Sequence, residues 1–274
     1  MVNFYLSENP VHNAVIEAFY DGCAAEKKLI EGFAYEPGEV AVVFGVDKSK
    51  VKVSWPRGRI ISQQRKNNGD VLVLETGYIN RGDGKNHHYA AGFNGLNGRA
   101  DFRNKNMGPE RLAALGLPLR PYSRGKNVIL CGQVPWDASV DHHNHVEWLN
   151  KTAEELKQRT TRPIIFRPHP LADLPPLPGC EFSKNPFLYD LSEAHCVVTF
   201  NSNCGVEALF HGKPVFALDE GSMCWSVCSK DLKDIEEPWY PAPQLRIQWA
   251  RDLAHTQWTL DEMREGLAWR HLFR

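Results

Sequence analysis

Short apolar segments that alternate with helical segments are the feature of this chain that most constrains its fold. In the second half, the apolar segments are rich in Val and Ile and are bounded by polar or turn residues, which is typical of buried parallel strands. They are residues 127–131, 163–166, 196–200 and 214–218. The segments between them with helical spacing are residues 146–158, 187–193 and 205–210. This alternation predicts a doubly wound α/β domain with a parallel sheet and right-handed crossovers.

The first half of the chain carries the same pattern in a reduced form. The predicted elements are an apolar segment at residues 3–6, a helix at residues 11–28 and buried strands at residues 40–46 and 71–74. Residues 75–124 are rich in Gly, Asn and Arg, which predicts long functional loops with one short helix near residues 109–115. The tail has aromatic and aliphatic residues at helical spacing and predicts two packed amphipathic helices.

These patterns predict an α/β fold with three parts. We expect residues 1–124 to form a Rossmann-like domain of reduced size and residues 125–245 to form a second, doubly wound Rossmann-like domain. Residues 246–274 are predicted to form helices that pack back on the first domain. The chain has 274 residues, of which 42% are hydrophobic, enough for one large core or two modest ones.

The composition also bears on where the protein works. No run approaches the ~20 apolar residues that span a bilayer, and the N-terminus lacks the basic start and apolar core of a signal peptide. The seven cysteines include no Cys-x-x-Cys pair, so we expect buried free thiols rather than a zinc ribbon or a redox couple. A cytoplasmic protein without a membrane span is therefore expected.

The strongest candidate site follows the strand at residues 196–200. The chain there reads FNSNCGVEAL, and HGKPV comes next. A polar turn that opens a helix at Gly205 presents backbone N–H groups and the positive end of the helix dipole to an anion. Ser202 and Asn203 add side-chain donors, and Glu207 can accept hydrogen bonds from ribose hydroxyls. An ordinary N-capped helix is the alternative interpretation.

Other strand ends carry further polar groups. The segment FRPHP places Arg167 and His169, both suited to a leaving phosphate, beside prolines that stiffen the strand exit. The segment GQVPWDAS adds the amide of Gln133 and the carboxylate of Asp137, and ETGY adds Glu75. Two carboxylates at strand ends are what acid, base or nucleophilic roles at an anomeric carbon require. A helix cap or a turn is the alternative role for each of them.

Together, these segments resemble the capsule-polysaccharide glycosyltransferase group that includes the Kdo transferases. The matching segments are ETGYI, GQVPWDASV, IIFRPHP and VVTFNSNCGVEALFHGKPVFALDEGSMCW, in that family's order over residues 75–225. The resemblance implies a GT-B fold, with two Rossmann-like domains facing a cleft and a nucleotide-sugar donor bound mainly by the C-terminal one. It also implies that Asp137 is the catalytic carboxylate, supported by Glu75. The predicted donor-binding residues are Gln133, Arg167, His169, Ser202, Asn203, Gly205 and Glu207.

The charge distribution suggests an anionic acceptor. Residues 48–126 hold 16 Lys and Arg against 5 Asp and Glu, a local charge of +11 in a chain of net charge −1. A compensated, solvated surface is the alternative. The loop YINRGDGKNHHYAAGFNGLNGRADFRN departs from the capsule enzymes and resembles small phage glycosyltransferases suspected of decorating hydroxymethylated pyrimidines in DNA. We therefore favour a 5-hydroxymethylpyrimidine in double-stranded DNA as the acceptor, reached by base flipping, in the host cytoplasm if the chain is phage-encoded.

Two sets of residues belong to this acceptor hypothesis. The predicted acceptor-binding residues are Arg81, His88, Asn94, Asn97 and Arg99. The cations predicted to contact the DNA backbone are Arg57, Arg59, Arg65, Lys66, Arg99 and Arg103.

Residues 141–145, DHHNH, form the cluster most suggestive of a metal. Adjacent histidines at a helix start point in different directions, and no distal partner motif stands out. The chain also has no Asp-x-Asp motif, the usual carrier of a nucleotide-bound divalent ion in the other large glycosyltransferase fold. We therefore predict no metal site and no cofactor, with the nucleotide-sugar as a co-substrate.

Three other functions stay open. The first is a glycosyltransferase that builds a surface polysaccharide. The second is a nucleotide-sugar epimerase, a group that shares the fold and a similar Gly-x-Glu-Ala-x-x-x-Gly-Lys-Pro-Val run. The third is a non-catalytic nucleic-acid-binding module, which leaves the donor-type motifs unexplained. The sugar, its nucleotide (UDP, GDP or CMP), the anomeric outcome and the oligomeric state also stay open.

Overall fold

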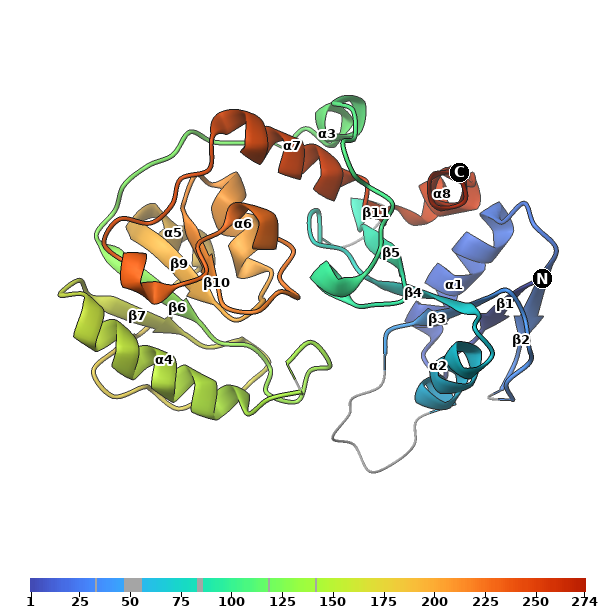
Figure 1. Ribbon diagram of the computed structural model, residues 1–274, viewed down its shortest axis with the longest axis horizontal. Coiled ribbons are helices and arrows are strands. Elements are labelled where there is room, and N and C mark those ends of the chain that lie inside the picture. Colours follow the sequence, from blue (N-terminus) through green and yellow to red (C-terminus); the bar gives the residue numbers. More distant parts are fainter. Residues whose placement is uncertain (33, 47–55, 83–85, 118, 141) are drawn as a thin grey trace. The chain divides into compact units, whose positions relative to one another are not determined.

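The computed structural model describes residues 1–32, 34–46, 56–82, 86–117, 119–140 and 142–274 (Figure 1). The chain forms two compact units, of which unit 1 is Met1–Arg111 with Arg251–Arg274 and unit 2 is Leu112–Ala250. The first boundary precedes the predicted one at residue 124, because Arg120 and Ser123 are hydrogen-bonded to the rest of unit 2. There the backbone N–H of Arg120 donates to the Phe210 carbonyl, at 2.9 Å.

Unit 1 contains a six-stranded sheet in the order β11-β5-β4-β3-β1-β2. The strands are β1 (Val2–Tyr5), β2 (Lys27–Ile30), β3 (Val40–Phe44), β4 (Asp70–Thr76), β5 (Tyr89–Phe93) and β11 (Gln257–Trp258). The first four are parallel, whereas β5 and β11 pair antiparallel and extend one edge. The predicted loop region from residue 75 onward therefore contains a strand, β5, that the sequence pattern missed.

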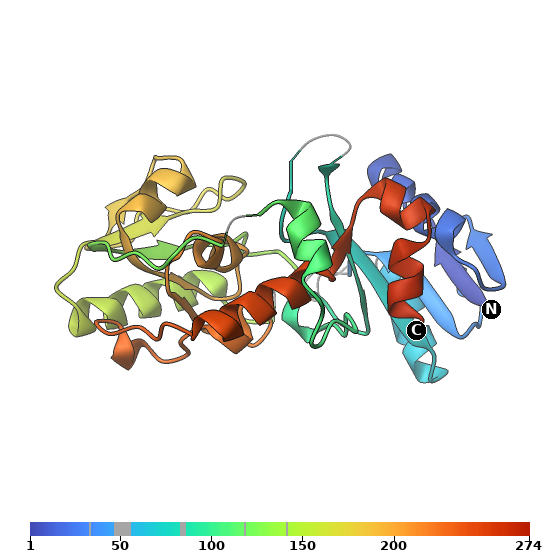
Figure 2. The ribbon, with the colours of Figure 1, turned by 90° about the horizontal axis from the view of Figure 1, so that it is seen from above.

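Helices cover both faces of this sheet. They are α1 (Pro10–Gly22), α8 (Leu260–Arg264) and α9 (Leu267–Leu272) on one face and α2 (Pro56–Lys66) on the other. Unit 1 also contains the 3₁₀ helix η2 (Asn97–Arg99) and the start of α3 (Glu110–Leu115), most of which belongs to unit 2. Alternate residues of each strand point to opposite faces, so Val42 and Leu72 pack with α1, α8 and α9, while Val43 and Val71 pack with α2. Figures 1 and 2 show α8 and α9 beside α1.

Helix α1 is shorter than its predicted range of residues 11–28. Asn9 accepts from the Val11 N–H at its start, with Pro10 in the first turn. At its end, the Lys27 ammonium donates to the carbonyls of Tyr20, at 2.6 Å, and Cys23, at 3.0 Å. This cation satisfies helix-end carbonyls, and the chain continues into β2 instead of a longer helix.

The tail also differs from the two predicted helices. It contains α7 (Pro243–Ala254), whose last residues belong to unit 1, then β11, α8 and α9. Thr259 and Glu262 form a capping box that starts α8, and Gly266, at φ +74°, separates α8 from α9. Trp258, Met263 and Trp269 then pack into the core of unit 1.

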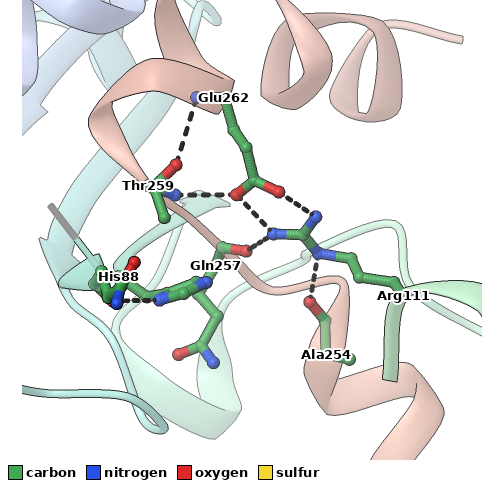
Figure 3. Close-up of polar contacts among 7 residues, drawn as sticks. His88, Arg111, Ala254, Gln257, Thr259 and Glu262 are labelled. Atoms are coloured by element: carbon green, nitrogen blue, oxygen red, sulfur yellow. Dashed lines mark hydrogen bonds and ion pairs between the residues drawn. The ribbon is translucent and has the colours of Figure 1, made fainter. Parts of the chain in front are cut away.

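Arg111 anchors this tail to unit 1 (Figure 3). Its guanidinium binds both carboxylate oxygens of Glu262 and donates to the carbonyls of Ala254 and Gln257. The same group lies 3.8 Å from the centre of the Trp258 ring. One side chain from α3 thus contacts four residues of the returning chain.

Unit 2 contains a five-stranded, fully parallel sheet in the order β10-β9-β6-β7-β8, as the alternating pattern predicts. Its strands are β6 (Asn127–Cys131), β7 (Ile164–Arg167), β8 (Glu181–Phe182), β9 (Ala194–Thr199) and β10 (Val215–Ala217). Its helices are α4 (His145–Arg159), α5 (Phe187–Ser192), α6 (Cys204–Phe210), most of α7, η3 (Trp225–Val227) and η4 (Leu232–Asp234). Helix α4 buries Leu149 and Leu156 against β6 and β7, and α6 packs on β9 and β10 (Figure 1).

All seven cysteines are free, and five of them are buried. Within the described ranges, no helix combines the length and apolar character that crossing a bilayer requires.

Candidate functional site

The strand order of unit 2 reverses between β6 and β9. In parallel α/β sheets, the crevice at the carboxyl ends of two such strands is where ligands bind. Gln133 follows β6 and Asn201 follows β9, and they are joined across this point. The Gln133 amide donates to Asn201 Oδ1 at 2.8 Å and accepts from the Asn201 backbone N–H at 3.0 Å. Gln133, predicted to bind donor, thus joins the two loops at the switch point.

Asp137 lies in the turn between β6 and α4. Its Oδ1 accepts from the backbone N–H of Ser139, at 2.9 Å, and from the Ser139 hydroxyl, at 2.7 Å. The Asp137 N–H donates to the Val134 carbonyl at 3.0 Å, so two successive turns shape this loop. The carboxylate is exposed and is held in one orientation by its own turn.

The predicted phosphate and nucleotide residues gather where β9 leads into α6. Ser202 donates its backbone N–H to Thr199 Oγ1 at 3.0 Å, and its hydroxyl accepts from the Cys204 N–H at 3.3 Å. The Asn203 amide donates to Glu207 Oε1 at 3.3 Å. The helix begins at Cys204, one residue before the predicted start.

Gly205, predicted to bind donor, has a clear packing role. A Cβ at this position would lie 2.8 Å from Cys224 Sγ and 3.2 Å from Val215 Cγ1. Glycine therefore lets the first turn of α6 approach β10 and the Cys224 loop closely.

Arg167 and His169 follow β7. The Arg167 guanidinium binds the buried carboxylate of Asp190 at 3.1 Å and the Asn185 carbonyl at 2.5 Å. Some of its N–H donors are therefore used in contacts within unit 2. His169 Nδ1 accepts from the Leu171 N–H at 3.1 Å, which puts the proton of the neutral ring on Nε2. Both side chains are partly exposed.

The histidine segment forms an aromatic cluster around Phe200. His143 stacks on Phe200 with ring centres 3.9 Å apart, and His145 stacks on Trp148 at 5.2 Å. His145 Nε2 accepts from the Gln133 N–H at 2.9 Å, and burial together with His143 lowers the pKa of His145 to about 4. The ring is therefore neutral. Among the described residues no group of three His, Cys, Asp or Glu could hold a metal ion, and residue 141 lies outside them.

In unit 1, the strand order reverses between β1 and β3. The His12 ring stacks on Phe44 at the end of β3, with ring centres 4.1 Å apart. Burial and the nearby Arg57 charge lower the pKa of His12. Arg57 donates to the Phe44 carbonyl, and a Cβ on Gly45 would lie 2.9 Å from Arg57 Nη1 and 3.5 Å from Glu75 Oε2. Glu75 thus lies at the edge where the parallel strands of this sheet end, with His12 and Arg57 nearby.

The predicted acceptor residues divide into structural and exposed groups. His88 is 4% exposed, and burial lowers its pKa. Asn94, at φ 58°, bonds Asp70 Oδ1 and the Val71 N–H, and so holds the β4–β5 edge. Asn97 Oδ1 accepts from the Tyr78 hydroxyl at 3.3 Å. Arg81 and Arg99 are exposed.

The other predicted DNA contacts lie in unit 1. Arg59, Arg65, Lys66 and Arg103 are exposed, although Arg65 donates to the Asn94 carbonyl and Arg103 to the Leu272 carbonyl. Residues 48, 50, 52 and 85, which contribute to the predicted charge, lie outside the described residues.

Sequence reasoning missed Asn201 and Asp219. Both follow strands of the unit 2 sheet, β9 and β10, and Asn201 Nδ2 donates to Asp219 Oδ1 at 2.8 Å. Their positions in the sequence could have identified them, because each comes one or two residues after an apolar strand segment.

Comparison with known proteins supports the fold. No protein-family model and no curated protein sequence matches the chain. Among solved structures, Thermosulfurimonas dismutans KpsC, beta Kdo 2,4 transferase, matches with a TM-score of 0.62 at 14% identity, over 91% of this chain and 89% of that chain. The beta Kdo 2,7 transferase of the same KpsC matches with a TM-score of 0.60 at 17% identity, over 97% and 98%. The chain therefore has the Rossmann-like α/β fold of these glycosyltransferases, in agreement with the resemblance to the Kdo-transferase group.

Proposed function

We propose that the protein is a glycosyltransferase of the GT-B type that uses a nucleotide-sugar donor without a metal ion. Unit 2 binds the donor and unit 1 binds the acceptor. The observation that carries this proposal is the exposed, oriented Asp137 carboxylate beside the switch point of a parallel sheet, in a chain with the fold of two Kdo transferases.

The overall reaction follows from these groups. The bond from the anomeric carbon to the donor phosphate breaks, and the phosphate leaves with the electron pair. The acceptor oxygen forms the new bond to that carbon and gives up its proton to the Asp137 carboxylate. Arg167, His169 and the Ser202–Asn203 turn stabilise the leaving phosphate, because each can donate hydrogen bonds to an anion. Asp137 is the catalytic carboxylate, and Glu75 in unit 1 supports it.

We propose a saccharide as the acceptor and Kdo as the first sugar to test. This choice is based on the two solved structures that share this fold, both of which are Kdo transferases. It replaces DNA as the preferred acceptor, because the shared fold supports the polysaccharide alternative more directly than the local charge supports DNA.

Donor binding is tested first. UDP-, GDP- and CMP-sugars, with an activated Kdo among them, are screened by thermal shift, because a ligand at 100 times its Kd stabilises a fold by about 2.7 kcal/mol. The donor that binds is then incubated with saccharide acceptors, and the products are weighed. We expect the acceptor to gain the mass of one sugar residue. We expect the same gain when EDTA is present. His169→Ala and Ser202→Ala should weaken donor binding. An absolute requirement for Mg²⁺ or Mn²⁺ would contradict the metal-free part.

A hydroxymethylpyrimidine in DNA remains a second candidate acceptor, because residues 48–126 carry a local charge of +11. Arg59, Lys66 and Arg99 are exposed in this segment. DNA binding through such cations weakens steeply as salt rises, since bound counterions are released. Incubation with hydroxymethylated and unmodified DNA, followed by digestion to nucleosides and mass measurement, distinguishes the two acceptors. A glycosylated nucleoside would restore DNA as the acceptor.

A further inference from the structure

One hydrogen-bonded group links the loops that follow β6, β9 and β10 in unit 2. Asn201, only 5% exposed, is its centre. Its Nδ2 donates to the Ser139 carbonyl at 2.9 Å and to Asp219 Oδ1 at 2.8 Å, while its Oδ1 accepts from Gln133. The Asp219 side chain is 9% exposed and also accepts from the Gly221 N–H, at 2.9 Å, and faces His142 Nε2, at 3.6 Å.

The orientation of every amide in this group is determined by its neighbour. The backbone N–H of Asn201 can only donate, so it must face Gln133 Oε1, and Gln133 Nε2 must then face Asn201 Oδ1. Asn201 Nδ2 is left to meet the two acceptors, Ser139 O and Asp219 Oδ1. A reversed Asn201 amide would bring oxygen against oxygen at Ser139 and Asp219, and nitrogen against nitrogen at Gln133. By accepting from Asn201 Nδ2, the Asp219 carboxylate therefore stabilises one arrangement of the group.

This arrangement reaches the proposed catalytic carboxylate. Ser139 is held through its carbonyl by Asn201 and through its N–H and hydroxyl by Asp137. Asp137 itself has an exposed side chain, so its position depends on the turn that contains it. Asn201, at the switch point of the sheet, therefore holds the end of Ser139 that Asp137 does not contact.

We infer that Asn201 and Asp219 are positioning residues that fix the Asp137–Ser139 turn, and with it the Asp137 carboxylate, for sugar transfer. The role in transfer rests on the proposed function; the structural link to the turn does not. Neither residue needs to touch the sugar. Misplacement of a reacting group by about 1 Å can lower turnover by about 100-fold.

A measurement on the turn itself tests the structural link. Trp136, 55% exposed, directly precedes Asp137 and reports on this turn. The full chain is labelled with 5-fluorotryptophan, and the ¹⁹F resonance of Trp136 is assigned by Trp136→Phe. We expect Asp219→Ala and Asn201→Asp to shift or broaden this resonance. Asp219→Asn keeps an oxygen toward Asn201 and Gly221 and should restore the wild-type signal.

Activity provides the second readout. With the donor found by the thermal-shift screen, Asp219→Ala and Asn201→Asp should lower kcat by about 100-fold while the donor KM changes by less than about threefold. Asp219→Asn should recover most of kcat. Asn150→Asp, an isosteric change on the exposed face of α4, is the matched control and should alter neither readout.

The outcomes separate the two claims. An unchanged Trp136 resonance in Asp219→Ala overturns the positioning role, and so does a loss in donor binding equal to the loss in turnover. If the wild-type chain transfers no sugar from any donor, the proposed function fails, and with it the role in transfer. The ¹⁹F spectra still decide whether Asn201 and Asp219 fix the turn.

Discussion

The guanidinium of Arg111 binds the carboxylate of Glu262 through two parallel hydrogen bonds, from Nη1 to Oε1 at 2.7 Å and from Nη2 to Oε2 at 2.8 Å. Figure 3 shows the carbonyls of Ala254 and Gln257 around the same guanidinium. The pair is mostly buried, with side chains 12% and 26% exposed. Bidentate, partly buried pairs of this kind contribute more to stability than exposed ones.

Arg111→Lys should therefore destabilise unit 1. A lysine supplies one ammonium group and cannot match two carboxylate oxygens, two carbonyls and the Trp258 ring together. We expect the free energy of unfolding to fall by on the order of 2 kcal/mol. Denaturant unfolding measures the loss. Arg264→Lys, in the exposed pair with Asp261, is the control and should cost less than about 0.5 kcal/mol. Equal losses of stability in the two variants would show that the Arg111 contacts contribute no more than an exposed ion pair does.

Glu262 should make stability depend on pH. Burial opposes ionisation, but hydrogen bonds from Arg111 and the Thr259 N–H, with the Arg111 charge, outweigh it and lower the pKa of Glu262 below its ordinary value. A lowered carboxyl pKa means that the unfolded chain takes up the proton first. The stabilisation of the fold by ionised Glu262 is therefore complete above the unfolded pKa of about 4.3, and it is lost as pH falls through the folded pKa. Glu262→Gln should lower the Tm at pH 7, and the difference from wild type should shrink below pH 4.

Asp137→Asn should nearly abolish sugar transfer while donor binding stays intact. The asparagine can keep the turn by accepting from Ser139 through its carbonyl oxygen, so only the charge and basicity are removed. Loss of a catalytic carboxylate costs several kcal/mol in the barrier. Turnover and donor affinity are measured together. Asp173→Asn, at an exposed position in the same unit, is the control. Near-normal turnover in Asp137→Asn would remove this residue from the mechanism.

Gly205→Ala should lower stability, because its Cβ would meet Cys224 Sγ at 2.8 Å. Overpacking of this kind costs about 1–3 kcal/mol. Gly205→Ala combined with Cys224→Ala should recover part of that loss, since the colliding sulfur is gone. A Gly205→Ala variant with wild-type stability and weakened donor binding would instead support a direct role in the donor site.

His145 should lower the stability of unit 2 in acid. Its folded pKa of about 4 lies below the usual value of about 6.5, so the unfolded chain binds the proton first as pH falls. Stability is complete above pH 6.5 and declines toward pH 4, by up to roughly 3 kcal/mol. His145→Gln, neutral at every pH, should flatten this part of the stability profile. An unchanged profile would mean that His145 is not protonated on unfolding in this range.

The sequence predicted the strands that are buried on both faces. Val40–Phe44 and Ala194–Thr199 are almost continuous apolar segments, because helices cover both sides of each sheet. Strand β5 reads YAAGF, without a β-branched residue, and β11 has two residues, so neither carries a strand signal of its own. Their pairing depends on partners far along the chain, which spacing cannot reveal.

From the sequence, the positions of the candidate site residues at strand ends could be predicted, but the contacts between these residues could not. Polar residues after apolar strands must collect at one edge of a parallel sheet, which is why the Asp137, Arg167 and Ser202 segments could be found. The bonds that join Gln133, Asn201 and Asp219 link loops separated by whole helices, and no local pattern encodes them. Asn94 reads as a loop contact in the sequence, yet its positive φ and its bonds to β4 make it part of the scaffold.

The division of unit 1 between the two ends of the chain affects its assembly during synthesis. Its core needs Trp258, Met263 and Trp269, which leave the ribosome after all of unit 2. Unit 2 is continuous, so its chain is complete while the N-terminal segment still lacks β11, α8 and α9. Domains generally fold as units, the N-terminal one first. Here the later-made unit can finish first, and the nascent N-terminal half leaves the β5 edge and part of an apolar face uncovered until β11, α8 and α9 have been synthesised.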